Sequence, residues 1–301
     1  MVSVEPLSLL TSDGLRLPAT LYRAPSPRAV VVLAGGTGIP HGFYRHFARG
    51  LSEHGLTVLS FDYRGLAHTG VPLRMADWGR RDLDAALQQG SALASALPLL
   101  FVGHSVGGQL FGLAEHASHV RAALLIASQS GYWRLWPGGW RWRRWLDWHL
   151  IMPLAIRFTG TLPGALMGGA TLPGGIAREW VRWCRSPHYL CEQDGTPMRD
   201  HFARLRLPMR FYHITDDDAV APLAAVRALM EFYPVAGKEL RQWSPAQWGV
   251  KTLGHVGVFR PAASAAWGEI AGWLLGQIPV TTRCMAENRM AEAHTGFDIY
   301  T

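Results

Sequence analysis

The feature that most constrains the fold is a serine between two glycines at the end of an apolar run. Residues 97–102 read Leu-Pro-Leu-Leu-Phe-Val, and Gly-His-Ser-Val-Gly-Gly follows, which places Ser105 in a G-x-S-x-G sequence. A short apolar run is typical of a strand buried on both faces. Gly103 and Gly107 permit a sharp turn in which a side chain would collide with backbone. We therefore expect a strand, a turn that carries Ser105, and a helix over 105–118.

Two later segments support Ser105 as a nucleophile. A serine nucleophile needs a base to take its proton and an acid to hold that base. The apolar run 207–214 is followed by the three aspartates 216–218, and His255 lies in a glycine-containing segment further on. The order along the chain is therefore serine, aspartate, histidine. The alternatives are a glycine-rich turn without catalysis and aspartates that form turns or cap helices.

These motifs resemble those of the α/β-hydrolase superfamily, and more closely those of bacterial hydrolases of the serine aminopeptidase S33-like, or Hydrolase_4, type. The resemblance is carried by Gly-His-Ser-Val-Gly-Gly at 103–108, Asp-x-Val-x-Pro at 218–222 and Gly-His-Val-Gly-Val-Phe at 254–259. Further similar stretches lie at 33–40, 60–65 and 130–134. The resemblance spans most of residues 1–275 and implies an α/β-hydrolase fold with a Ser-Asp-His triad.

The resemblance also selects one aspartate of the cluster. In similar hydrolases the triad acid stands four residues before the proline of D-x-V-x-P. This register selects Asp218, ahead of Pro222, with Asp217 as the alternative. The other two aspartates would then cap backbone amides or stay solvated.

An oxyanion hole needs backbone amides near the serine. The first is expected at Val106, directly after the nucleophile, and the second in the glycine-rich loop after the strand 29–34, at Gly36 or Thr37. This loop has Ala34 where the family often has a histidine, so both donors stay open. The loop completes neither the G-x-x-x-x-G-K-[ST] nor the G-x-G-x-x-G pattern, which argues against nucleotide binding.

Strands and helices alternate along most of the chain. After a hairpin at 6–10 and 15–23, strands are expected near 29–34, 56–61, 98–102, 121–127, 207–214 and 238–243, and helices near 42–54, 77–96, 105–118, 222–232 and 262–275. This rhythm predicts an α/β fold with a mostly parallel, doubly wound sheet and helices on both faces. The 301 residues, 49% of them hydrophobic, suffice for one such domain with an insertion.

The rhythm stops after the strand near 121–127, and the interval is too long for an ordinary loop. We predict a discontinuous core of residues 1–130 and 206–278 and an inserted helical cap over 131–205. The cap begins with six tryptophans between Trp133 and Trp148, interleaved with four arginines. Such a cap could roof an apolar pocket, pack as simple core, or lie peripherally on an anionic membrane surface.

We expect four residues near the start of the cap and the turn to line the substrate pocket: His104, Tyr132, Trp133 and Trp136. Packing or hydrogen bonding is the alternative role for His104. The residues 279–301 mix polar and small side chains without periodicity, and we expect a poorly tied tail.

Composition bears on partners and cofactors. The net charge of +7 would suit nucleic acid, but the arginines are spread along the chain and no nucleic-acid motif accompanies them, so we expect no nucleic-acid partner. Cys184, Cys191 and Cys284 form neither a disulfide framework nor a zinc pattern, and the histidines, His68 among them, show no metal signature. We therefore expect no metal and no cofactor. The start of the chain lacks a basic region followed by an apolar one, so cytoplasmic location is the default expectation.

Together these observations indicate a serine hydrolase that forms an acyl-enzyme on Ser105, with His255 as base and a small-molecule ester or thioester bearing an apolar acyl group as substrate. The alternatives are an acyltransferase on the same triad, an S33-like aminopeptidase, and a non-catalytic module that binds a membrane surface. Ester hydrolysis is favoured over peptide hydrolysis, because the cap offers no clear acidic pocket for a substrate ammonium. The oligomeric state stays open.

Overall fold

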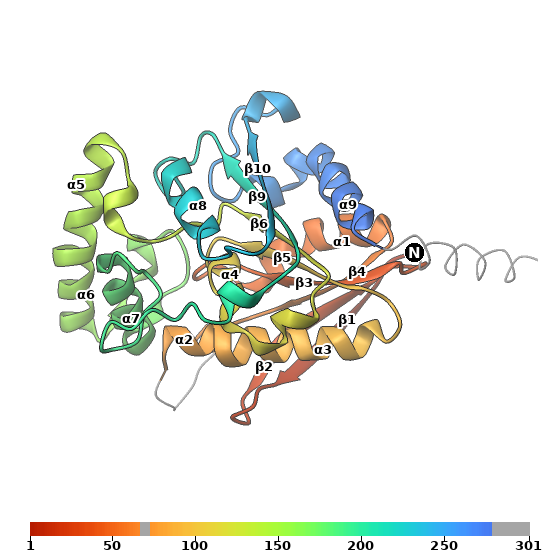
Figure 1. Ribbon diagram of the computed structural model, residues 1–301, viewed down its shortest axis with the longest axis horizontal. Helices are drawn as coiled ribbons and strands as arrows, with labels where there is room; N and C mark the ends of the chain where they lie inside the picture. The colour runs from red at the N-terminus through yellow and green to blue at the C-terminus, as the bar shows by residue number, and fades with distance from the viewer. Residues whose placement is uncertain (67–72, 279–301) are drawn as a thin grey trace, which may run out of the picture.

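The computed structural model describes residues 1–66 and 73–278, and a single eight-stranded sheet runs through it (Figure 1). Its strand order is β1-β2-β4-β3-β5-β6-β9-β10. The strands are β1 (Ser3–Leu10), β2 (Arg16–Arg23), β3 (Ala29–Ala34), β4 (Leu56–Phe61), β5 (Leu99–His104), β6 (Ala122–Ile126), β9 (Pro208–Ile214) and β10 (Gly237–Trp243). β1 pairs with β2 and β2 pairs with β4 in antiparallel fashion, and the strands β4, β3, β5, β6, β9 and β10 pair in parallel. The predicted mostly parallel sheet is confirmed.

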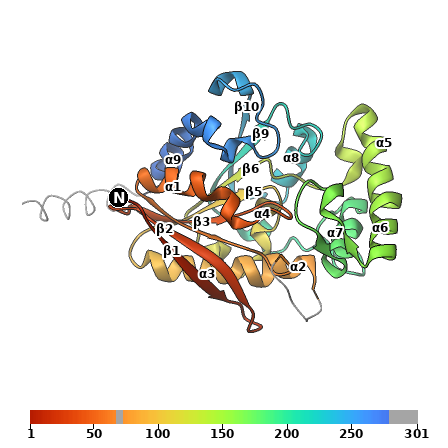
Figure 2. The ribbon, with the colours of Figure 1, turned by 180° about the vertical axis from the view of Figure 1, so that it is seen from behind.

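Helices cover both faces of this sheet. The helices outside the insertion are α1 (Arg45–Glu53), α2 (Met75–Asp77), α3 (Asp84–Ala94), α4 (Val106–Gln109), α8 (Leu223–Met230) and α9 (Trp267–Gly276). α1 and α9 lie on one face and α3 on the other, as the two opposite views show (Figures 1 and 2). Every residue of β3, β4, β5 and β6 is buried, which explains why these strands are continuous apolar runs.

The segment between β6 and β9 adds helices to one side of the sheet. It contains α5 (Gly138–Leu146), a π-helical segment (Asp147–Ile151), α6 (Met152–Thr159) and α7 (Gly174–Arg185), together with the short strands β7 (Thr161–Leu162) and β8 (Leu172–Pro173). β7 and β8 pair with each other in a separate two-stranded sheet. The three helices stand together at the left of Figure 1 and at the right of Figure 2. The division into core and cap at 131 and 205 stays a prediction.

The helix predicted over 105–118 is wrong in length. α4 ends at Gln109, and 3-10 turns at Phe111–Leu113 and Glu115–His119 replace its continuation. Glycine is a poor helix former, and a side chain at Gly112 would come within 2.3 Å of the Phe202 ring. Close packing therefore selects glycine at this position, at the expense of a longer helix.

Arg64 ties the loop after β4 to the rest of the core. Its Nε lies 2.7 Å from Asp82 Oδ1 and its Nη1 2.8 Å from Asp13 Oδ2, and the Arg64 side chain is almost fully buried. The Arg64 amide also donates to Asp82.

Within residues 1–66 and 73–278, no helix has the length and apolar character that a membrane crossing requires. The expected tail 279–301, with Cys284, and also His68 lie outside the described residues.

Candidate active site

Ser105 stands at a strained turn between β5 and α4. Its φ is +51° and its ψ is −119°, a backbone conformation that residues other than glycine rarely adopt. A Cβ on Gly103 would lie 2.6 Å from the Gly108 backbone, and one on Gly107 would lie 2.2 Å from the Ala34 carbonyl oxygen. Glycine is therefore required at both positions, as the sequence pattern predicts.

Asp217 is the aspartate that contacts His255. Its Oδ2 lies 2.6 Å from His255 Nδ1, and only 3% of the Asp217 side chain is exposed. Asp218 is 56% exposed and lies 3.7 Å from His213 Nε2. The placement predicted for Asp218 beside His255 is therefore wrong, and the alternative residue occupies that place.

A tight turn at the end of β9 explains the difference. The Asp217 amide donates to the Ile214 carbonyl, and the Asp217 carbonyl accepts from the amides of Val220 and Ala221. This turn directs the Asp217 carboxylate inward and leaves Asp218 toward solvent. Counting back from Pro222 cannot detect it, because the count contains no information about where the turn begins.

Asp216 holds the loop that carries His255. Its carboxylate accepts hydrogen bonds from Thr252 Oγ1 at 2.8 Å and from the amides of Leu253 at 2.9 Å and Gly254 at 3.0 Å. Burial raises the pKa of Asp216, but these hydrogen bonds outweigh it, and the pKa lies below its ordinary value. The aspartate cluster thus contains a residue that anchors the loop and a residue that orients the histidine.

His104 links three parts of the site through hydrogen bonds. The Gly36 amide donates to the Tyr44 hydroxyl at 2.7 Å, the hydroxyl lies 2.7 Å from His104 Nδ1, and His104 Nε2 lies 2.8 Å from the His255 carbonyl oxygen. Burial lowers the pKa of His104 well below its ordinary value, and the neighbouring His255 acts in the same direction. A neutral His104 fits this chain, with Nδ1 as acceptor and Nε2–H as donor. Its role is to brace the site, which was the alternative to lining the pocket.

These hydrogen bonds distinguish the two amides that we expect as oxyanion donors in the early loop. The Gly36 amide is already used by Tyr44, so Gly36 is not available as a donor. Thr37 lines the pocket that contains Ser105, and its amide makes no hydrogen bond to any residue in the described part of the chain. Val106 begins α4 directly after Ser105, where the first amides of a helix have no intrahelical acceptor.

Comparisons with known proteins agree with this fold. The family described as Serine aminopeptidase, S33 matches residues 25–163. A monoglyceride lipase from Saccharomyces cerevisiae has a TM-score of 0.62 at 15% identity and covers 91% of this chain and 96% of its own. The chain therefore has the fold of the α/β hydrolases.

Two further α/β hydrolases show the same fold. An esterase domain from Rhodothermus marinus has a TM-score of 0.56 at 18% identity and covers 91% of this chain and 98% of its own. An esterase from Pyrococcus furiosus has a TM-score of 0.60 at 14% identity and covers 92% of each chain. No curated protein sequence matches the chain.

The pocket that contains both Ser105 and His255 has a volume of about 310 Å³. Much of its lining is apolar, and most of the apolar side chains come from the insertion. Those of the insertion are Trp136, Trp148, Met152, Leu166, Met167 and Trp180, and those of the core are Ile39, Val220 and Val256. Trp148 and Trp180 pack edge to face, with ring centroids 4.9 Å apart. In the described part of the chain, no group of three or more histidine, cysteine, aspartate or glutamate side chains is placed to hold a metal ion.

Of the four residues expected to line this pocket, the structure places Trp136 there. Trp136 Nε1 also donates to the Ala219 carbonyl at 3.0 Å, which ties it to the loop after Asp217. Tyr132, Trp133 and His104 do not line the pocket, because Trp133 packs against His149 and His104 is buried behind the site.

The sequence analysis missed Arg144, Trp148 and Met152, which line the pocket from α5, the π-helical segment and α6. Their spacing of four residues was a usable signal, since residues four apart share one face of a helix. A prediction that named helix faces in the insertion would have found them.

Proposed function

We propose that the protein is a serine hydrolase that cleaves a carboxylic ester or thioester with an apolar acyl group through an acyl-enzyme on Ser105. The observation that carries this proposal is the arrangement of three residues. Ser105 and His255 line one pocket, and His255 Nδ1 lies 2.6 Å from the buried carboxylate of Asp217. A nucleophile, its base and an orienting acid require these three residue types at one site.

The proposed reaction begins with proton transfer from Ser105 Oγ. The His255 Nδ1–H donates to Asp217, which leaves Nε2 as the atom that takes the serine proton. Ser105 Oγ then attacks the carbonyl carbon, and the amides of Val106 and Thr37 donate to the resulting oxyanion. His255 Nε2–H protonates the departing alcohol or thiol, and a water molecule activated by the same nitrogen releases the acid.

Asp217 and the amides contribute without exchanging protons with the substrate. The Asp217 carboxylate stabilises the imidazolium that forms when His255 accepts the serine proton. An oxyanion donor of this kind contributes about 10²–10³-fold to kcat in serine hydrolases. Asp216 and His104 keep the His255 loop in place, so they position the base and do not touch the reacting atoms.

The pocket lining supports an acyl substrate over a peptide amino terminus. An aminopeptidase needs a carboxylate to bind the substrate ammonium, and none of the residues described as lining this pocket is aspartate or glutamate. Arg144 lines it instead, and its charge opposes an ammonium group. Indole and thioether side chains suit an apolar acyl chain.

The experiment that tests the proposal is labelling with a fluorophosphonate, read by intact mass, with p-nitrophenyl esters of increasing acyl length measured beside it. We expect one adduct in the wild type, none in Ser105→Ala or His255→Ala, and a normal adduct in the control Ser118→Ala, whose side chain is exposed. Absence of an adduct in folded wild type contradicts the proposal. Faster turnover of aminoacyl p-nitroanilides than of any ester contradicts the substrate class alone.

A further inference from the structure

The outward side of the insertion exposes large apolar side chains at regular spacing. Trp142, Leu146, Leu150, Leu154 and Phe158 recur every four residues along α5, the π-helical segment and α6, and all are exposed. Trp142 is 69% exposed and Phe158 is 80% exposed. Isolated exposed apolar residues are ordinary, but an aligned series is not, and such series mark interaction surfaces.

The π-helical segment keeps this series on one side. On an α-helix of 3.6 residues per turn, side chains four residues apart drift steadily around the axis. A π-helical turn holds more residues than an α-helical turn, so four residues fall short of a full turn there. The π-helical segment Asp147–Ile151 therefore shifts the side chains in the opposite direction and reduces the drift between α5 and α6. We call the exposed series, together with Arg157, Arg178 and Arg185, the outer face.

Arginines predominate among the charges beside the series. Seven arginines lie on α5, α6 and α7: Arg141, Arg143, Arg144, Arg157, Arg178, Arg182 and Arg185. The carboxylates of the same run and of α7 are Asp147, which pairs with Arg143 and Arg144, and Glu179, which pairs with Arg74 and Arg182.

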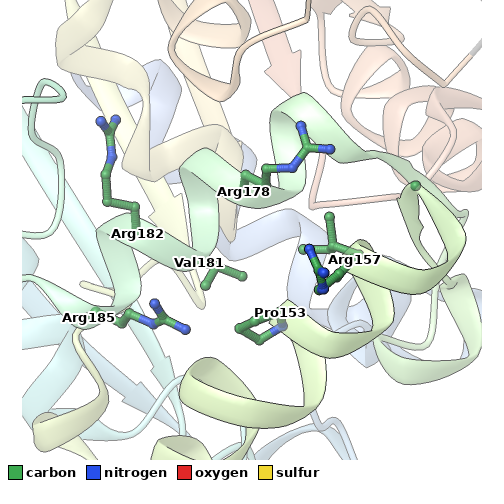
Figure 3. Close-up of a pocket in the computed structure, with 8 residues that line it drawn as sticks. Pro153, Arg157, Arg178, Val181, Arg182 and Arg185 are labelled. Atoms are coloured by element: carbon green, nitrogen blue, oxygen red, sulfur yellow. The ribbon is translucent and has the colours of Figure 1, made fainter.

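A groove of about 540 Å³ between α6 and α7 gathers the arginines that these carboxylates leave uncompensated. Arg157 of α6 and Arg178 and Arg185 of α7 line it, with Pro153 and Val181 as apolar floor (Figure 3). In Figure 3 the Arg185 side chain extends across the gap toward Pro153. Within the described residues, neither Arg157 nor Arg178 forms an ion pair with a carboxylate. The groove therefore combines free positive charge with apolar surface.

We propose that the outer face docks on an anionic lipid surface. Exposed tryptophan, leucine and phenylalanine side chains enter the boundary between headgroups and acyl chains, and arginines next to them bind the headgroup phosphates. The charge of the groove complements such a surface and does not complement a neutral one. The proposal does not depend on catalysis by Ser105.

Charge also decides against a second copy of the chain as the occupant. A two-fold contact places the same patch of both copies together, so the arginines at 157, 178 and 185 would approach their own counterparts. Facing like charges without compensating carboxylates opposes such an interface. An anionic bilayer meets the same patch with charges of opposite sign.

Docking would bring the bilayer close to the pocket. The helical run that carries the outer face presents Arg144, Trp148 and Met152 to the pocket on its other side. The thickness of one helix, about 10–12 Å, then separates the lipid surface from the pocket wall. A substrate that partitions into the membrane would start near its site.

The test is co-sedimentation of the full chain with vesicles of phosphatidylcholine alone and of phosphatidylcholine mixed with phosphatidylglycerol, at low and high sodium chloride. We expect binding to the mixed vesicles that weakens with salt. Phe158→Ser should reduce binding about tenfold, from its lost apolar burial, and Arg157→Gln and Arg178→Gln about fivefold each. Leu10→Ser on β1 and Arg45→Gln on α1, which are exposed and lie outside the insertion, are the matched controls and should bind as wild type.

Ser105→Ala should also bind as wild type, which separates this test from that of the proposed function. Equal binding to both vesicle types, or wild-type binding by Phe158→Ser, overturns the proposal. The proposal is also overturned if light scattering shows a dimer that Phe158→Ser dissociates while neither vesicle type retains the protein.

Discussion

The edge of the sheet where the parallel strands end, which we call the sheet edge, differs from the inserted helices in what positions its functional side chains. At this edge, the backbone conformation places Ser105, and hydrogen bonds to Asp216 and Asp217 place His255. In the insertion, one helical run carries a pocket-lining series at 144, 148 and 152 and an exposed series from 142 to 158. Side-chain identity on each face, and not a special backbone, gives that region its character.

This difference separates two kinds of specificity. The reacting groups need positions fixed within a fraction of an ångström, which strained backbone and buried carboxylates provide. The proposed choices of acyl group and of lipid surface would depend on shape and charge summed over several side chains, which a helix with two differently composed faces can provide. We therefore expect substitutions at the sheet edge to abolish activity or stability, and substitutions in the insertion to change activity only partly.

The largest effect is expected for the aspartate that contacts the histidine. Asp217→Asn should lower kcat about 10⁴-fold, because an amide no longer holds the required His255 tautomer or stabilises its charged form. The matched variant Asp218→Asn should leave kcat near the wild-type value, since that side chain is largely exposed. Steady-state kinetics with a p-nitrophenyl ester measures both, and a greater loss in Asp218→Asn would show that the turn after β9 is placed differently in the active protein.

The next largest effect, on the free energy of unfolding, is expected for the buried ion pair of Arg64 and Asp82 in the core. Arg64→Met should cost about 3–5 kcal/mol of unfolding free energy, because Asp82 is left buried without its partner. The matched Arg143→Met removes a largely exposed cation of α5 while Asp147 keeps Arg144 as its partner, so it should cost less than about 1 kcal/mol. Urea unfolding gives both values, and similar costs would mean that the two regions are held together in the same way.

The smallest effect is expected within the insertion, and it compares the two faces of one helical run. Trp148→Phe should enlarge the pocket, move the preferred acyl chain to greater length and change kcat/KM for the best wild-type ester about tenfold. Trp142→Phe, on the outer face, should leave the same chain-length profile unchanged. If both variants shift the profile alike, the two faces do not have separate roles.

Much of this protein could be predicted from local patterns. Alternating apolar runs and helical segments predict the α/β fold, and the parallel strands β3 to β6 are recognisable because both their faces are buried. Gly103 and Gly107 reveal the strained turn, since close backbone contact excludes any larger residue. These features are local, so the sequence contains the information they need.

The sequence by itself therefore determined the order of elements, the turn at Ser105 and the histidine that shares its pocket. Only the tertiary structure decided that Asp217 and not Asp218 meets His255, that Tyr44 occupies the Gly36 amide, and that the insertion turns Trp148 toward the pocket and Trp142 away from it. The physical reason is that these outcomes depend on where a turn starts and which donor is already satisfied. Both are settled by contacts between residues far apart in the chain.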